Sequence, residues 1–293
     1  MVLLPWTPPY DWAWMVGFLQ ARAVAGVERF HDGGYSRSFG VEGHRGLIHL
    51  APDEEAQGLR VSLSPGLQPV AEICYARIGQ LFDLACDPRQ VARALGDLAQ
   101  ARPGLRLPGA LDAFEQAVRA VLGQLVSVAM AARLTAKVAA GWGEPLAEAP
   151  GYVLFPTPEA LSRADPQALK ALGMPLRRAE ALIHLARAAL SGELPLTARR
   201  ILTPGCVNCR PCPGLAAGRQ TTLPCAAGRR RYLLPDDYLI KQRFPGMTPA
   251  AIARYARRWQ PMRSYALLHI WYTDDWAPRR NSRPGRIPLV SGR

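Results

Sequence analysis

The chain has 293 residues, of which 49% are hydrophobic and 20% charged. This composition excludes the disordered and fibrous classes, and the length suffices for two or three domains with hydrophobic cores. A net charge of +13 suggests a polyanionic partner, but most of it comes from arginines in residues 198–231 and 277–293, two segments without an acidic residue.

The first 18 residues, MVLLPWTPPYDWAWMVGF, are apolar but contain three prolines and an aspartate. They have neither the charged start nor the small-residue cleavage site of a signal peptide, and they are too interrupted to span a membrane. We therefore expect a cytoplasmic protein with no membrane partner.

Residues 23–63 alternate apolar and polar side chains around Gly and Asp-Gly turns, which predicts a short antiparallel sheet. Apolar residues at helical spacing follow in 69–84 and again in 88–100, where Asp87-Pro88 reads as an N-cap with proline at the first helical position. The expected N-terminal domain is α+β and covers residues 1–88.

The rest of the chain reads as helices. Thr157-Pro158 and Asp165-Pro166 are helix starts, and Gly173 and Gly192 stand where helices end. The predicted helices are 110–124, 127–142, 157–164, 165–173, 176–190, 236–244, 248–259 and 263–273. Residues 198–231 are the one long segment of this helical part without a helical pattern, and such gaps are unusual inside compact domains.

Residue types that could carry chemistry also have ordinary structural interpretations. Asp236 and Asp237 follow Pro235 at a helix start, where a carboxylate can cap its own helix. Trp271 and Tyr272, on an apolar helix, and Leu125, after a helix, are read as core. His184 and His269 have no partner at metal-ligand spacing, so they are read as structural.

Four of the six cysteines, Cys206, Cys209, Cys212 and Cys225, lie close together at a spacing that resembles zinc or iron–sulfur ligation. Against a metal site, the segment has no amphipathic pattern and prolines flank Cys212.

Several long stretches resemble the AlkA-type DNA-3-methyladenine glycosylases of the helix-hairpin-helix superfamily. The runs are PPYDWAWMVGFLQARAV, RPGLRLPGALDAFEQAVRAVLGQLVSVAMAARLTAKV, FPTPEALSRADPQALKALGMPLRRAEALIHLA, LPDDYLIKQRFPGMTPA and RSYALLHIWYT. The resemblance implies a TATA-binding-protein-like α+β domain followed by a mostly α-helical, two-domain glycosylase core. We assign 89–112 plus 232–276 to the helical domain with the catalytic aspartate and 113–231 to the other, and we expect 277–293 to be a disordered tail.

The resemblance also implies the site. The second Asp of LPDDY, Asp237, falls at the catalytic aspartate, where a carboxylate stabilises an oxocarbenium-like state and orients water. Tyr238 and Trp271 match pocket aromatics, which favour electron-poor alkylated bases. Leu125 matches the residue that fills the gap left by the flipped base. Hydrolysis of this kind requires no metal or other cofactor, and the expected partner is double-stranded DNA containing alkylated bases, bound by a monomer.

One departure from the family is large. Its Leu-Pro-Gly-(Ile or Leu)-Gly-x-Trp-Thr-Ala-Asn-Tyr hairpin binds a DNA phosphate and adds pocket aromatics, but here CPGLAAGRQTT takes its place, with Gly218 at the Trp and Thr222 at the Tyr. A shift of reading frame explains this. One coding of residues 212–228, read one base earlier, gives LPGLGRWTANYLALRGW, so the cysteines and arginines of 198–231 are by-products of the shift.

Two functions follow. The first is an alkylbase DNA glycosylase with its catalytic aspartate in place and its DNA-anchoring hairpin scrambled. The second is a non-catalytic DNA-binding protein whose cysteine cluster holds a metal. Stoichiometric zinc or iron in the purified protein would favour the second.

Overall fold

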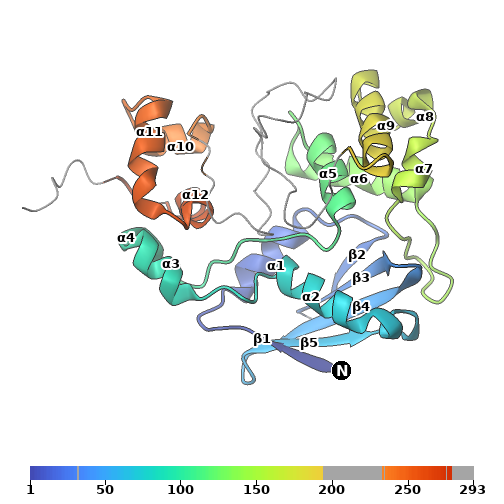
Figure 1. Ribbon diagram of the computed structural model, residues 1–293, viewed down its shortest axis with the longest axis horizontal. Helices are drawn as coiled ribbons and strands as arrows, with labels where there is room; N and C mark the ends of the chain where they lie inside the picture. The colour runs from blue at the N-terminus through green and yellow to red at the C-terminus, as the bar shows by residue number, and fades with distance from the viewer. Residues whose placement is uncertain (32, 194–232, 234, 275, 279–293) are drawn as a thin grey trace, which may run out of the picture.

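The computed structural model describes residues 1–31, 33–193, 233, 235–274 and 276–278 (Figure 1). The cysteine cluster, the segment 198–231 with its predicted frame shift, and almost all of the tail 277–293 lie outside them. In Figure 1 the sheet lies at the bottom, helices α5 to α9 stand on one side, and α3, α4 and α10 to α12 stand on the other.

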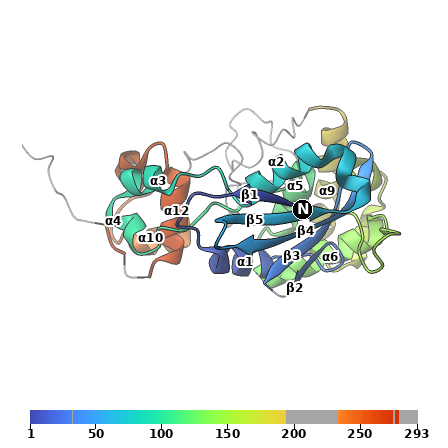
Figure 2. The same ribbon diagram turned by 90° about the horizontal axis from the view of Figure 1, so that it is seen from below.

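The N-terminal part is a five-stranded antiparallel sheet in the order β1-β5-β4-β3-β2. Figure 2 shows the strands side by side in this order. The predicted sheet is confirmed by β2 (Glu28–His31), β3 (Gly34–Val41), β4 (His44–Asp53) and β5 (Gly58–Leu63). The first strand, β1 (Val2–Pro5), was not predicted; it pairs with β5 in a register that sets Val2 opposite Val61.

Three helical segments pack on this sheet: α1 (Trp12–Gln20), the 3₁₀ helix η1 (Pro65–Val70) and α2 (Ala71–Leu81). Their apolar side chains share a core with the strands that includes Met15, Ile48, Val61 and Ile78, all fully buried. The expected α+β N-terminal fold is thus confirmed, although α1 was not among the predicted helices. Asp11 begins α1 by accepting a hydrogen bond from the Trp14 backbone N–H at 3.0 Å.

A second core joins segments far apart in the sequence. Helices α3 (Pro88–Leu95) and α4 (Asp97–Gln100) pack with α10 (Tyr238–Arg243), α11 (Pro249–Tyr255), the 3₁₀ helix η2 (Ala256–Trp259) and α12 (Arg263–Tyr272). The prediction of one helix over 88–100 was wrong. Gly96 divides this segment into two helices. Its backbone angles, φ 57° and ψ −131°, are accessible to glycine but do not occur within an α-helix.

The third core belongs to α5 (Ala113–Leu122), α6 (Val128–Trp142), α7 (Pro158–Ser162), α8 (Pro166–Ala171) and α9 (Leu176–Leu190). The predicted starts are confirmed, since Thr157 and Asp165 accept hydrogen bonds from backbone N–H groups of α7 and α8. Gly173 and Gly192, just past α8 and α9, have positive φ angles, as expected at helix ends. The domain boundaries given above remain a prediction, to which these separate cores lend support.

His269 on α12 is fully buried, which agrees with its interpretation as a structural residue. Burial, together with the nearby Arg102, lowers the pKa of His269 to about 4. His184 is exposed on α9. The neutral His269 imidazole contributes stability above the pKa of about 6.5 of an unfolded histidine, and this contribution is lost as pH falls toward 4.

We therefore expect acidification from near pH 7 to about pH 4.5 to cost about 2 kcal/mol of unfolding free energy through this residue. Urea unfolding at the two pH values measures it. His269→Leu should flatten the pH dependence and His184→Leu should not. An unchanged pH dependence in His269→Leu would contradict the assignment.

Candidate active site

Asp237 stands at the N-cap of α10. Its backbone is extended (φ −61°, ψ 139°), and its Oδ1 accepts a hydrogen bond from the Ile240 backbone N–H at 3.1 Å. The capping interpretation is therefore confirmed, yet a cap occupies only one carboxylate oxygen. Asp236, the preceding residue, is exposed and pairs with Lys241 at 3.1 Å.

Trp271 on α12 contacts the same carboxylate. Its indole Nε1 donates a hydrogen bond to Asp237 Oδ1 at 3.0 Å, and both residues are half-buried. Oδ1 thus has two donors, from α10 and from α12, which fix the plane of the carboxylate. Within the described part of the chain no donor contacts Oδ2, so this oxygen is the one available to a ligand.

Tyr238 follows Asp237 at the start of α10 and is 66% exposed. Leu125 lies elsewhere, on the loop between α5 and α6, and is 80% exposed with a φ of 58°. Its interpretation as a core residue was wrong, because the loop turns its side chain into solvent. The structure thus joins Asp237 to Trp271 directly and has Tyr238 next to Asp237 at the start of α10, while Leu125 lies on the loop between α5 and α6.

Helix α1 brings further aromatic residues to α12. Trp14 packs edge-on against Tyr272, the neighbour of Trp271, with ring centroids 5.2 Å apart. Trp14 also contacts Phe18, and the Arg22 guanidinium lies 3.6 Å from the Phe18 ring centroid. Burial lowers the pKa of Arg22, and Tyr272 partly offsets this effect. An aromatic and cationic surface therefore extends from α12 onto α1.

Two family models match the chain. The AlkA N-terminal domain matches residues 1–112, and the HhH-GPD superfamily base excision DNA repair protein matches residues 118–264. The DNA-3-methyladenine glycosylase 2 of Escherichia coli is 58% identical over 281 residues, which are 95% of this chain and 99% of that protein. The chain belongs to the HhH-GPD superfamily of base excision DNA repair proteins.

Other relatives agree with this membership. A probable bifunctional transcriptional activator/DNA repair enzyme AlkA of Mycobacterium tuberculosis is 30% identical over 94% of the chain and 58% of its own length. A solved 3-methyladenine DNA-glycosylase from Archaeoglobus fulgidus shares the fold, with a TM-score of 0.71, 18% identity and coverage of 92% of this chain and 97% of that one. This HhH-GPD protein thus has the α+β and helical architecture of a DNA glycosylase.

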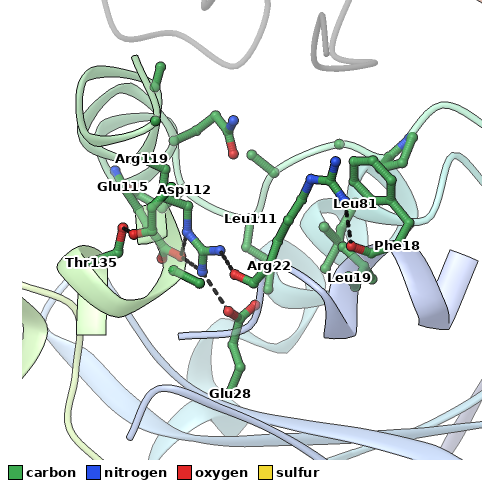
Figure 3. Close-up of a pocket in the computed structure, with 18 of the residues that line it drawn as sticks. Phe18, Leu19, Arg22, Glu28, Leu81, Leu111, Asp112, Glu115, Arg119 and Thr135 are labelled. Atoms are coloured by element: carbon green, nitrogen blue, oxygen red, sulfur yellow. Dashed lines mark hydrogen bonds and ion pairs between the residues drawn. The ribbon is translucent and has the colours of Figure 1, made fainter. Parts of the chain in front are cut away.

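A pocket of about 150 Å³ lies between α1, α5 and α6 of the HhH-GPD protein (Figure 3). Phe18 and Arg22 line one wall, and Gln116, Arg119 and Val126 are among the residues that line the other. Asp237, Tyr238, Trp271 and Leu125 are not among its lining residues. The pocket therefore adjoins the α1 aromatic surface and is distinct from the Asp237 carboxylate.

Buried charges form the floor of this pocket. Arg119 donates to Glu28 at 2.6 Å and to Glu115 at 2.5 Å, and Arg37 donates to Glu115 at 2.6 Å. Burial would raise the pKa of Glu28, but Arg119 and Arg37 outweigh burial and hold it below its usual value. These paired charges connect the sheet to α5, and we regard them as a structural clamp.

Sequence reasoning missed Phe18 and Arg22, and it read Tyr272 only as a core residue. The run WAWMVGFLQAR contains Phe18 and Arg22, but their relation to α12 depends on contacts between distant segments.

Among the described residues no group of three or more His, Cys, Asp or Glu side chains could hold a metal. No described helix has the length and apolar run needed to cross a bilayer.

Proposed function

We propose that this chain is a monofunctional DNA glycosylase that flips alkylated bases such as 3-methyladenine and 7-methylguanine out of duplex DNA and hydrolyses their N-glycosidic bond. The observation that carries the proposal is the Asp237 carboxylate. Ile240 N–H and Trp271 Nε1 hold one of its oxygens, and no donor from the described residues contacts the other, which we assign to the sugar. Base excision repair begins with this reaction.

The reaction needs one fixed negative charge and one water molecule. As the bond between C1′ and the base nitrogen breaks, its electron pair leaves with the base and positive charge develops on the sugar. The Asp237 carboxylate stabilises that charge and accepts a proton as water adds to C1′. An alkylated purine that already carries positive charge departs as a neutral base, so it needs no strong general acid, metal or redox cofactor.

The aromatic residues suit such a base. Cationic rings are attracted to the faces of Trp and Tyr side chains, and we assign base contact to Trp271 and Tyr238. Trp271 would then have two roles, since its N–H is bonded to Asp237. In this proposal Phe18, on the adjoining α1, extends the stacking surface through Trp14 and Tyr272.

Leu125 supplies the wedge in this proposal. This large apolar side chain is 80% exposed, so most of its surface is not covered within the fold. Insertion between base pairs would cover this surface, and it would offset part of the cost of unstacking, roughly a few kcal/mol per step.

We further propose that the protein acts as a monomer on double-stranded DNA in the cytoplasm. The E. coli relative is a bacterial protein, which supports the cytoplasmic location. The alternative of a non-catalytic DNA-binding protein with a cysteine-bound metal is not favoured by the HhH-GPD match over residues 118–264.

The direct test is release of free 3-methyladenine from methylated duplex DNA, measured by chromatography. The assay should be run on the chain as it stands and on a variant with the family-like hairpin, described in the Discussion. Release by either supports the proposal. If neither releases an alkylated base while both bind DNA, the glycosylase assignment is wrong.

Trp271→Phe separates the two roles of this residue. It retains an aromatic face but loses the indole N–H, so we expect kcat for base release to fall about tenfold to a hundredfold, the scale of one lost donor to a reacting group. KM should change little. Single-turnover and steady-state kinetics provide both values.

Trp142→Phe on α6, which packs against the third core, is the matched control and should leave kcat within about twofold, as expected for a site remote from the chemistry. A Trp271→Phe variant with normal kcat and raised KM would mean that Trp271 acts by stacking alone.

A further inference from the structure

The loop that carries Leu125 is held in a strained conformation. Leu125 has a φ of 58°, in the left-handed region that a leucine rarely adopts. The side chain is 80% exposed, so little burial of leucine atoms offsets the strain. Observed strain at an exposed apolar residue indicates that another contact maintains it, and that the conformation has a use.

Contacts fix the loop at both ends. At its start, the Gly123 N–H donates to the Arg119 carbonyl at 2.9 Å and closes α5. At its end, Ser127 caps α6 by accepting a hydrogen bond from the Met130 N–H at 3.2 Å. Neither contact fixes the peptide between Gln124 and Leu125, which adjoins the strained N–Cα bond of Leu125.

Arg178 makes a contact that fixes the peptide between Gln124 and Leu125. Its Nη2 donates a hydrogen bond to the Gln124 carbonyl oxygen at 2.6 Å. Arg178 is half-buried in the first turn of α9, which packs against α5 (Figure 1). The guanidinium is therefore presented from a helix of the third core, and not from the loop itself.

Peptide geometry connects this hydrogen bond to the strain. The Gln124 carbonyl belongs to the rigid peptide plane that includes the Leu125 nitrogen and reaches the Leu125 Cα. If that plane rotated by about half a turn, φ of Leu125 would change from positive to negative and the strain would be relieved. The same rotation would turn the carbonyl away from Arg178. A charge-assisted hydrogen bond is strong enough to oppose it.

We propose that Arg178 is a positioning residue for Leu125: by holding the Gln124 carbonyl, it keeps the wedge aimed out of the loop before DNA arrives. This inference rests on the proposed wedge function of Leu125. Arg178 does not touch the base in this scheme, and its effect passes entirely through Leu125.

The main competing role is a direct phosphate contact by Arg178. The two roles differ in measurable ways. A lost phosphate contact lowers the dependence of binding on salt and weakens binding to any duplex. A lost positioning contact weakens only the binding that uses the wedge, and it has no effect once the wedge is removed.

A double-mutant cycle on the full chain tests the proposal. Arg178→Gln, Leu125→Ala and the double variant are compared with the parent for Kd on duplex DNA with a tetrahydrofuran abasic-site analogue and on undamaged duplex, at several salt concentrations. Arg177→Gln, an exposed neighbour of the same charge, is the matched control. Thermal melting reports folding, and Arg178→Lys retains a cationic donor if Arg178→Gln unfolds.

We expect Arg178→Gln and Leu125→Ala each to reduce the preference for the abasic analogue about fivefold to tenfold, and the double variant to match Leu125→Ala alone. The salt dependence should stay unchanged in Arg178→Gln, Arg178→Lys should recover part of the preference, and Arg177→Gln should retain it. These results would support the proposal.

Two outcomes would overturn the positioning role of Arg178 and leave the wedge function of Leu125 intact. In the first, Arg178→Gln retains the preference for the abasic analogue and Leu125→Ala loses it. In the second, the losses of the two single variants add in the double variant, and the salt dependence of binding falls in Arg178→Gln. A Leu125→Ala variant that retains the preference would instead refute the wedge function, and the role of Arg178 with it.

Discussion

Asp237→Asn should lower the rate of base release about a thousandfold, the scale of losing preorganised stabilisation of transition-state charge. Asparagine keeps the size of the side chain and an oxygen that can accept from Ile240 N–H and Trp271 Nε1, the two donors seen at Oδ1. It cannot supply a negative charge or take a proton from water. Because Asn caps helices as well as Asp does, the fold should survive.

Single-turnover release of 3-methyladenine and binding to an abasic-site analogue measure the two expectations. Binding should remain nearly intact, because in the proposed function it depends on phosphate contacts and the wedge rather than on this charge. Asp236→Asn is the matched control: the residue is adjacent and exposed, and its partner is Lys241. Robust release by Asp237→Asn would place the chemistry on another residue.

The second large effect concerns residues 198–231. We expect higher base release when residues 212–228, CPGLAAGRQTTLPCAAG, are replaced by LPGLGRWTANYLALRGW and the residues upstream, from 198, by their reading in the same frame. The replacement introduces the glycine-rich run whose backbone N–H groups bind a phosphate, and it places Trp and Tyr at positions 218 and 222, now Gly and Thr. We expect the rate of base release to rise about a hundredfold or more, because the replacement adds one phosphate-binding site and one aromatic side of the base pocket.

Release of 3-methyladenine by the two chains under identical conditions measures this gain, and thermal melting reports any accompanying change in stability. Asp237→Asn in the replaced chain is the control that assigns the gained activity to the same carboxylate. Equal release by both chains would contradict the frame-shift account and require residues 198–231 to act as they stand. The coding DNA across residues 195–235 provides an independent test.

The sequence alone determined most of the local elements, although not β1, α1 or the break between α3 and α4. Cap-plus-proline pairs such as Thr157-Pro158 and Asp165-Pro166 begin helices because their signals lie within one turn. The alternation in residues 23–63 predicted the strands for the same local reason. The run LPDDY was enough to place Asp237 at a helix start, and its resemblance to a family suggested a catalytic role.

Only the tertiary structure decided how distant segments meet. The pairing of β1 with β5, the approach of α12 to α10 that bonds Trp271 to Asp237, and the contact of Arg178 with Gln124 join residues tens of positions apart. Periodicity reports which face of an element is apolar, but not which partner covers it. For the same reason an apolar leucine was read as core: Leu125 is exposed because of how the loop between α5 and α6 folds, and the spacing of residues does not report that.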